Sequence, residues 1–188
     1  MFTDKKVLVC GMAKSGISAA LLLNEKGADV TLQDIKERES FGDLSYIEDK
    51  GIRLYLGKNP DEIIDEQDIL VLSPGVPCDL GFITKAKELN KEVISEIEVG
   101  YDFCPCPIAA VTGTNGKTTT TTLTGDIFKA YRNTAVVGNI GIPFTGEVNK
   151  LDENSYAVLE ASSFQLETVK DFRAHIAAVL NITPDHLN

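Results

Sequence analysis

The chain has 188 residues and a formal net charge of −10, with 43% apolar and 24% charged residues. These values are typical of a globular protein with room for one large domain or two small ones. The acidic charge argues against a general nucleic-acid or membrane-surface role, because both need broad basic patches, although a few amides and one lysine suffice to bind a small anion. No signal peptide follows Met1 and no apolar run approaches the roughly 20 residues of a bilayer span, so we expect a cytoplasmic protein without membrane insertion.

The chain contains four cysteines: Cys10, Cys78, Cys104 and Cys106. The Cys104-Pro-Cys106 sequence has no second cysteine pair and no nearby histidine, so we favour reduced structural thiols over a metal site. This cysteine usage also indicates a reducing compartment.

Short apolar runs alternate with helical stretches, which indicates an α/β fold with a mainly parallel sheet. In the first half, strands are predicted at Lys6–Cys10, Asp29–Gln33, Ile52–Leu56, Ile69–Leu72 and Glu92–Ser95, and helices at Ser15–Lys26, Leu44–Lys50 and Ile83–Asn90. Gly27 and Gly51 end the first two helices. The prolines of Ser73-Pro-Gly-Val-Pro77 cannot continue a strand, so this segment forms a loop at a strand's carboxyl end.

The composition changes near residue 97, where a connecting helix at Glu96–Phe103 and the stiff linker Cys104-Pro-Cys-Pro107 are predicted. Further strands are expected at Ile108–Val111, Ala135–Val137, Tyr156–Leu159 and Ile176–Leu180, with a helix through Tyr131. We therefore expect a Rossmann-like domain with a parallel sheet at residues 1–97. Residues 98–188 are expected to be the incomplete start of a P-loop-type α/β ATPase domain, because no helix follows the last strand.

A glycine loop, Gly113-Thr-Asn-Gly116-Lys117-Thr118, follows a strand of buried type and opens a helix. Phosphate binding needs this context, since the glycines turn backbone amides inward, the lysine reaches the β- and γ-phosphates and the threonine hydroxyl reaches Mg²⁺. Only two residues separate the glycines, against four in the common motif, so this is a shortened variant. The alternative is a glycine turn that happens to precede a lysine.

An acidic residue is expected at the end of a neighbouring strand, where it can hold Mg²⁺ directly or through water. Glu160 meets this expectation, because it ends the apolar run Tyr156-Ala-Val-Leu-Glu160. By itself, Glu160 would be an ordinary residue at a strand end, and only the glycine loop makes a metal role the better interpretation.

A second glycine motif, Gly11-Met-Ala-Lys-Ser-Gly16, lies between the first strand and the first helix. It resembles G-x-G-x-x-G with Ala13 in place of the middle glycine, and Asp34 ends the second strand where a dinucleotide fold binds a ribose hydroxyl. This motif leaves three alternatives open: NAD-like binding, another nucleotide, or a tight turn without a ligand. Local signals give no role to Asn139 or His186, and Ser162 is consistent with a helix cap.

Taken together, these segments resemble the Mur ligase family over residues 6–187. The phosphate loop from Thr112 to Thr118 resembles the short loop of that family, and Leu159-Glu-Ala-Ser-Ser-Phe-Gln-Leu-Glu167 is similar to a segment of its D-glutamate-adding member. Gly138-Asn-Ile-Gly141 and Asn181-Ile-Thr-Pro-Asp-His-Leu187 are similar to the same member.

The resemblance implies an ATP-dependent ligase of peptidoglycan biosynthesis, and hence a role in cell shape and division. Its substrates would be UDP-N-acetylmuramoyl-L-alanine and D-glutamate, joined through an acyl phosphate with ATP and Mg²⁺. We expect a monomer that binds no nucleic acid.

The resemblance also implies roles for individual residues. ATP would be bound by Gly113, Thr114, Asn115, Gly116, Lys117, Thr118 and Thr119. Thr118 would offer its hydroxyl to Mg²⁺, Glu160 would bind one Mg²⁺ and His186 a second. The uridine nucleotide would be bound by Lys14, Ser15, Asp34, Ile35, Lys36 and Gly75, and the muramoyl group by Asn139 and Ser162, with His186 as a further substrate-binding residue. Lys117 and His186 would be the catalytic residues. Lys14, Ala13 and Asn188 depart from the family pattern, which more often has an apolar residue, Gly and Asp there.

The family's carbamylated lysine and its D-glutamate-binding C-terminal domain would lie beyond Asn188, so we expect this chain to be inactive alone. Three alternatives remain: a related folate-polyglutamylating ligase, a non-catalytic nucleotide-binding module, and an NAD(P) oxidoreductase that uses the Gly11–Gly16 motif.

Overall fold

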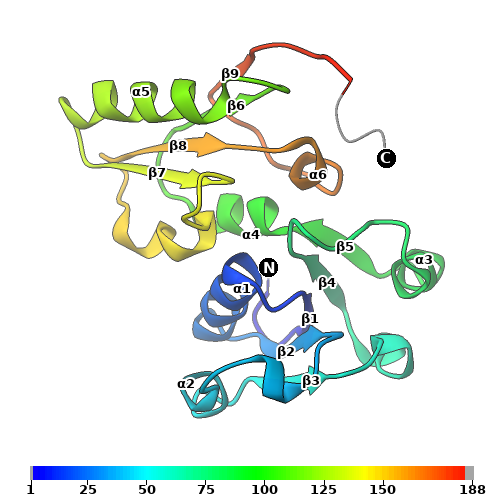
Figure 1. Cartoon of the computed structure of the whole chain (residues 1–188). Coiled ribbons are helices and arrows are strands. Elements are labelled where there is room, and N and C mark those ends of the chain that lie inside the picture. Colours follow the sequence, from blue (N-terminus) through cyan, green and yellow to red (C-terminus); the bar gives the residue numbers. More distant parts are fainter. Residues whose placement is uncertain (1, 185–188) are drawn as a thin grey trace. The chain divides into compact units, whose positions relative to one another are not determined.

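The computed structural model describes residues 2–184, which divide into two compact units, Met1–Glu96 and Ile97–Asn188. Each unit is a parallel sheet with helices (Figure 1), so the predicted α/β class is confirmed. Within residues 2–184, no helix combines the length and the apolar character that crossing a membrane requires.

The first unit contains a five-stranded parallel sheet in the order β3-β2-β1-β4-β5. Its strands are β1 (Lys6–Cys10), β2 (Asp29–Asp34), β3 (Arg53–Leu56), β4 (Ile69–Leu72) and β5 (Glu92–Ser95), and its helices are α1 (Lys14–Glu25), α2 (Ser45–Glu48) and α3 (Gly81–Glu88). The chain winds outward from β1 on one side and then returns to β4 on the other. Such a change of direction leaves a crevice at the carboxyl ends of the two central strands.

The central strands of this unit are buried on both faces, which is why they read as continuous apolar runs. Val7, Leu8, Val9 and Cys10 of β1 are completely buried. One cluster of the core contains Leu8, Cys10, Ile64, Leu70, Leu72, Phe82, Ile83 and Ala86. Helix α1 packs on the strands at close range, because a Cβ at Gly16 would lie 1.8 Å from the carbonyl oxygen of Gly11.

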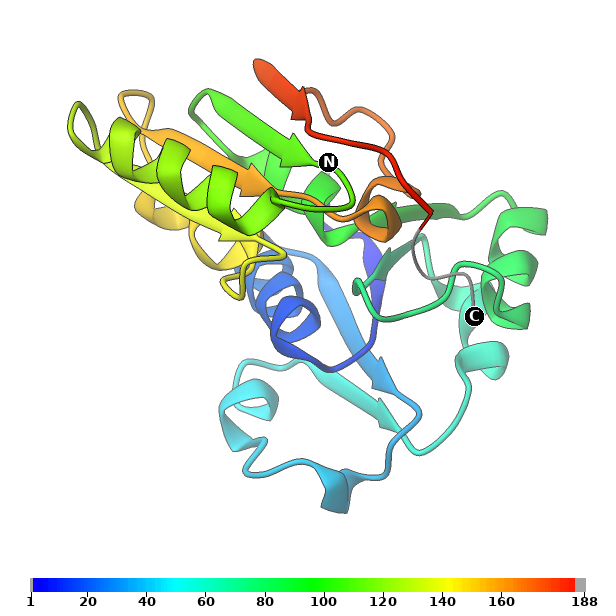
Figure 2. The same ribbon diagram turned by 45° about the horizontal axis from the view of Figure 1, so that its top comes forward.

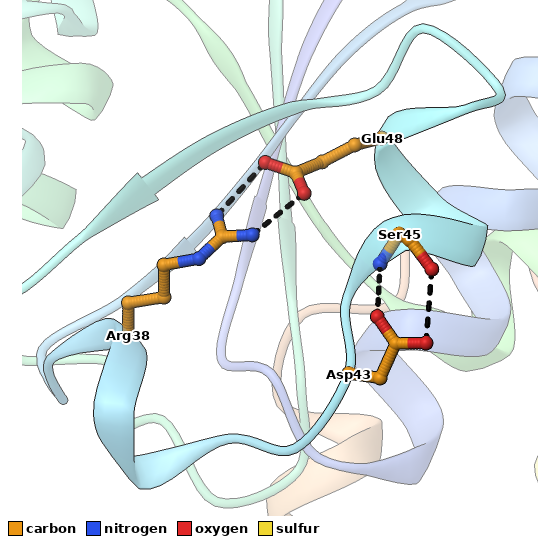
Figure 3. A network of polar contacts seen from close by, with 4 residues as sticks. All are labelled: Arg38, Asp43, Ser45 and Glu48. Carbon is orange, nitrogen blue, oxygen red and sulfur yellow. Dashed lines mark hydrogen bonds and ion pairs between the residues drawn. The ribbon is translucent and has the colours of Figure 1, made fainter.

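The loop between β2 and α2 is held by side chains of its own (Figure 3). The Arg38 guanidinium donates to both oxygens of Glu48 at 2.8 and 2.7 Å, and Asp43 accepts hydrogen bonds from the backbone and the hydroxyl of Ser45. The hydrogen bonds from Arg38 and from Ser45 lower the pKa values of Glu48 and Asp43 respectively. This network fixes the segment that follows Asp34, Ile35 and Lys36.

The second unit contains a parallel sheet in the order β7-β8-β6-β9. Its strands are β6 (Ile108–Thr112), β7 (Thr134–Gly138), β8 (Tyr156–Glu160) and β9 (Ile176–Val179), and its helices are α4 (Glu96–Phe103), which begins at the last residue of the first unit, α5 (Lys117–Lys129) and α6 (Ser163–Leu166). Figure 2 shows α5 lying along this sheet, and α5 packs on β6, β7 and β8.

The predicted strands agree with the structure to within one residue at each end. The helices differ more: α1 begins at Lys14, α3 at Gly81, and α5 ends at Lys129 instead of Tyr131. Helix α2 spans only Ser45–Glu48 because Ile47 is its single buried residue, which gives a longer helix little to pack against. The sequence marks α6 only by a capping signal, and it does not predict the short 3-10 helices at Arg38–Ser40, Pro60–Glu62, Ile64–Glu66, Phe144–Gly146 and Val148–Lys150.

Candidate nucleotide-binding sites

The glycine loop of the second unit joins the end of β6 to the start of α5. Gly113 and Gly116 have φ angles of 137° and 84°, in the region that L-residues with a Cβ avoid. A Cβ at Gly113 would also lie 3.0 Å from the carbonyl oxygen of Asn181. Both positions therefore require glycine for conformational reasons, as a phosphate-binding loop does.

Lys117 is the first residue of α5, and its ammonium lies over the loop. Its Nζ donates to the carbonyl oxygens of Gly113 at 2.8 Å and Thr114 at 3.0 Å. Thr118 and Thr119 follow it and are exposed at the beginning of the helix. The first amides of a helix have no partner within it and carry positive potential, so the start of α5 adds such amides to the ammonium of Lys117.

The loop is anchored to the segment after β9 by Asn181 and Thr183. The Asn181 side chain accepts from the Asn115 amide at 2.9 Å and donates to the Asn115 carbonyl at 2.9 Å, while its own carbonyl accepts from the Thr114 amide at 3.1 Å. The Thr114 hydroxyl donates to the Thr183 carbonyl and accepts from the Thr183 amide. Sequence reasoning gave Asn181 no role, although it belongs to a segment that resembles the family.

A cavity of about 710 Å³ opens beside the loop. It is lined by Thr112, Gly113, Thr114, Lys117, Ser162, Ser163, Phe164, Leu166, Glu167, Val179, Asn181, Ile182 and Thr183. The structure thus brings Gly113, Thr114 and Lys117 together with the predicted Ser162, whereas Asn115, Gly116, Thr118 and Thr119 are not part of the lining. Glu160 and Asn139 do not line this cavity.

Glu160 lies at the carboxyl end of β8, directly beside Val111 of β6. Only 1% of it is exposed, and its Oε1 accepts from the Asn139 side chain at 3.0 Å. Its Oε2 is buried and has no hydrogen-bond partner among residues 2–184. A buried carboxylate oxygen without a partner is costly, and a cation or a water is the kind of ligand that compensates for it.

Mg²⁺ prefers oxygen ligands and is commonly held by one or two carboxylates together with substrate phosphates and water. Glu160 therefore fits such a cation. Residues 2–184 hold no cluster of three or more His, Cys, Asp or Glu side chains, so the protein groups described here would supply only part of its coordination.

Ser162 begins α6 through a capping box with Gln165. Its hydroxyl accepts from the Gln165 amide at 3.3 Å and donates to Gln165 Oε1 at 3.1 Å, and its own amide donates to the same oxygen at 3.0 Å. Ser162 thus positions the α6 wall of the cavity. The predicted His186 lies outside the described residues.

A second cavity of about 270 Å³ lies at the carboxyl ends of β1, β2 and β4 in the first unit. Its lining residues are Gly11, Met12, Ala13, Gln33, Asp34, Ile35, Asn59, Ser73, Gly75, Val76, Pro77, Leu80 and Phe82. Asp34, Ile35 and Gly75 are brought together as predicted binding residues, whereas Lys14, Ser15 and Lys36 are not part of the lining. Asn59 was missed, because no local pattern marks it.

Asp34 ties the first glycine motif to the second strand. Its Oδ2 accepts from the Met12 amide at 2.8 Å and its Oδ1 accepts from the Lys36 amide at 3.0 Å. The carboxylate that would meet a ribose hydroxyl in a dinucleotide fold is therefore already engaged with backbone amides, although each oxygen keeps a further lone pair.

Two parallel α/β units, one with a glycine loop between strand and helix, define this chain as a phosphate-loop α/β protein. A family model described as the N-terminal domain of Mur ligase MurD-like proteins matches residues 5–95, and one described as the Mur ligase middle domain matches residues 111–188. The chain belongs to the Mur ligase family.

Relatives from several bacteria carry the name UDP-N-acetylmuramoylalanine--D-glutamate ligase, among them the following two. The chain is 49% identical to the one from Lachnoclostridium phytofermentans over 191 residues, which cover 100% of this chain and 42% of that protein. It is 47% identical to the one from Clostridioides difficile over 98% of this chain and 42% of that protein. The chain thus spans less than half the length of these relatives.

Solved structures share the fold at low sequence identity. The ligase named UDP-N-acetylmuramate:L-alanyl-gamma-D-glutamyl-meso-diaminopimelate ligase from Neisseria meningitides has a TM-score of 0.60 at 18% identity, over 99% of this chain and 63% of that one. A UDP-N-acetylmuramate-alanine ligase from Thermotoga maritima has a TM-score of 0.56 at 22% identity, over 98% and 43% of the two chains.

Proposed function

We propose that this chain forms part of an ATP-dependent ligase that adds D-glutamate to UDP-N-acetylmuramoyl-L-alanine in peptidoglycan synthesis. The observation that carries the proposal is the glycine loop with Lys117 at the mouth of a cavity, one strand away from the unpartnered oxygen of Glu160. The names of the relatives support this substrate pair.

In this proposal each unit binds a different nucleotide. The first unit takes the uridine nucleotide in the cavity lined by Asp34, Ile35 and Gly75. The resemblance to the family supports roles for Lys14, Ser15 and Lys36 in the same binding. The second unit takes the ATP phosphates at the loop from Gly113 to Thr119. By the resemblance to the family, Asn139 and Ser162 would contact the muramoyl group, and His186 would be a further substrate-binding residue.

The reaction is phosphoryl transfer followed by acyl transfer. The substrate carboxylate attacks the γ-phosphorus of ATP, so that an acyl phosphate forms and ADP leaves. The amine of D-glutamate then attacks the acyl carbon, loses a proton and expels phosphate, which forms the amide. Lys117 and the first amides of α5 neutralise and orient the transferred phosphoryl group, which is the main task of a protein in this chemistry.

A divalent cation, when bound, supplies charge neutralisation of the phosphate oxygens. The residues of this chain that would hold it are Glu160, through its buried Oε2, and Thr118, an exposed residue, through its hydroxyl. His186 is proposed as a further ligand. Asn139 holds the other oxygen of Glu160 in place.

Calorimetry with the chain and its Lys117→Ala variant tests this assignment. We expect binding of UDP-N-acetylmuramoyl-L-alanine, UDP and ATP by the parent chain, no binding of NAD, and loss of ATP binding alone in the variant. Lys129→Ala, at the far end of the same helix, is the matched control and should bind ATP normally. Binding of NAD without the uridine ligands would overturn the proposal.

The proposal also covers the behaviour of the chain by itself. We expect no D-glutamate-dependent phosphate release from these 188 residues alone, because they match only 42% of the length of their relatives. A coupled phosphate assay that gave turnover comparable to a full-length relative would contradict this. The proposed site of action is the cytoplasm and the proposed state is a monomer, which sedimentation equilibrium of the whole protein would check.

A further inference from the structure

Two cysteines lie close together outside both nucleotide sites, in the linker between α4 and β6. The sulfur atoms of Cys104 and Cys106 are 3.6 Å apart, in a hydrogen bond that either thiol can donate. Both thiols are free, and the linker Cys104-Pro-Cys-Pro107 places a proline after each of them. The prolines restrict the backbone of the linker, so the proximity of the two sulfurs is built into it.

The two thiols differ in their surroundings. Cys104 is partly buried, whereas Cys106 is only 4% exposed. Cys104 is therefore the more accessible of the two to a reagent, and the Cys106 sulfur lies 3.6 Å from it. This is the arrangement of an attacking and a resolving cysteine.

The pKa shifts of the two thiols agree with an attacking role for Cys104 and a resolving role for Cys106. The hydrogen bond from Cys106 lowers the pKa of Cys104 to about 7, which gives it a thiolate fraction at neutral pH. The same hydrogen bond, followed by burial and by the charges of Cys104 and Asp152, raises the pKa of Cys106. When Cys104 forms a bond to another sulfur, its sulfur loses the negative charge. Both the hydrogen bond with the Cys104 thiolate and the charge of Cys104, which raise the pKa of Cys106, are then lost.

The short distance between the two sulfurs and their different exposure indicate a reactive site that the ligase chemistry does not use. We propose that Cys104 and Cys106 form a redox-active dithiol, which a low-molecular-weight disulfide oxidises reversibly to a Cys104–Cys106 disulfide. A disulfide needs its sulfurs at about 2.05 Å and its Cα atoms within about 7 Å of each other. The Cα atoms of Cys104 and Cys106 meet the second condition, because two residues of chain span at most about 7 Å. A small movement of the linker is therefore enough to bring the sulfurs together.

The reaction balances with a disulfide of the glutathione type as oxidant. The Cys104 thiolate attacks one sulfur of the reagent, forms a mixed disulfide and releases one thiolate. Cys106 then loses its proton to solvent and attacks the Cys104 sulfur, which forms the internal disulfide and releases the second thiolate. Two protein thiols are oxidised and one reagent disulfide is reduced to two thiols. A bridge across one residue is strained, and strained disulfides are easily reduced, which makes the step reversible.

Mass spectrometry of the native chain tests the proposal. The reduced chain is incubated with oxidised glutathione, alkylated and digested with trypsin, so that the peptide of residues 92–117 carries Cys104 and Cys106 and neither other cysteine. We expect this peptide to lose two hydrogens and to regain them with dithiothreitol. We also expect Cys106→Ser to accumulate the glutathione adduct on Cys104, and Cys104→Ser to react at least ten-fold more slowly.

Cys78→Ser is the matched control, because Cys78 is also partly buried but lies in the first unit. It should leave the oxidation of the 92–117 peptide unchanged. The proposal is overturned if the parent chain stops at the glutathione adduct, if oxidation pairs either cysteine with Cys78 or with another chain, or if a chelator removes a stoichiometric metal from the two thiols. The parent chain alone decides among these outcomes, so the result does not depend on the folding of a variant.

Discussion

Gly16 illustrates how one missing methyl group sets the distance between a helix and a strand. A Cβ on this residue would lie 1.8 Å from the Gly11 carbonyl oxygen and 2.6 Å from the Ser73 hydroxyl. The backbone atom cannot move away without disturbing β1. Gly16 is therefore needed for packing, whatever ligand the neighbouring cavity binds.

We accordingly expect Gly16→Ala to lower the free energy of unfolding by about 3 kcal/mol or more, because overpacking against backbone has no cheap relaxation. Urea denaturation followed by circular dichroism measures this. Gly42→Ala is the control, since no atom lies within 4 Å of the position that its Cβ would occupy, and it should change stability by less than about 0.5 kcal/mol. Equal effects of the two substitutions would contradict the packing argument.

Asn181 acts at the residue scale on the phosphate loop. Its side chain holds both the amide and the carbonyl of Asn115, so the loss of that side chain frees this part of the loop to sample other conformations, although the backbone bond from the Thr114 amide remains. We expect Asn181→Ala to weaken ATP binding roughly ten-fold, about 1.4 kcal/mol, without changing the affinity for UDP. Calorimetry with both nucleotides on the same sample provides the internal control. A variant that kept its ATP affinity would show that the loop is ordered by other contacts.

At the scale of elements, Glu98 of α4 binds the backbone of a turn at residues 170–172, which follows α6. Its carboxylate, only 2% exposed, accepts from the amides of Lys170, Asp171 and Phe172 at 2.6, 2.8 and 3.2 Å. Hydrogen bonds to a buried charge are among the stronger ones, and their loss would leave backbone donors without partners. The helix and the turn are therefore expected to unfold together.

Glu98→Ala should lower the free energy of unfolding of the second unit by about 3 kcal/mol. Hydrogen exchange should locate the effect at the amides of residues 170–172, which we expect to lose most of their protection. Glu153→Ala, a change of the same kind on an exposed residue of the same unit, should be nearly neutral. Unchanged protection in Glu98→Ala would mean that the turn is held elsewhere.

The sequence predicted the elements best where burial enforces a pattern. The strands β1 and β4 are apolar on both faces, and their limits agree with the prediction. Helix α2 and the 3-10 helices were predicted poorly, because they bury few residues and depend on local contacts such as Arg38 with Glu48. In the candidate site, the glycines and Lys117 follow from local spacing, whereas Asn181 meets the loop only through the pairing of β6 with β9.

At the scale of the whole molecule, the second unit exposes a group of apolar side chains. Ile127 and Tyr131 near the end of α5 are 53% and 80% exposed, and Ile176 of β9 is 65% exposed. With seven other residues they line a hollow of about 530 Å³ that is mainly apolar. Exposed apolar hollows of this kind bind apolar molecules from solution.

We expect this chain to bind a dye such as anilinonaphthalene sulfonate in its native state, and Ile127→Lys to reduce the fluorescence at least two-fold. Lys129→Ala, on the same helix, should leave the signal unchanged. Dye fluorescence is measured beside a circular dichroism spectrum, so that any loss of structure is recognised. Equal fluorescence of the parent chain and Ile127→Lys would place the dye at another surface.

The anchoring of the loop by Asn181 has a consequence for how firmly a nucleotide is retained. The amides of Thr114 and Asn115 already donate to Asn181, so they are not available to the phosphates of a nucleotide. The phosphates would be bound by the first amides of α5 and by the ammonium of Lys117. A shallow hold of this kind favours rapid departure of the spent diphosphate. We therefore expect the ordered loop to bind ATP through these few groups and to release ADP rapidly.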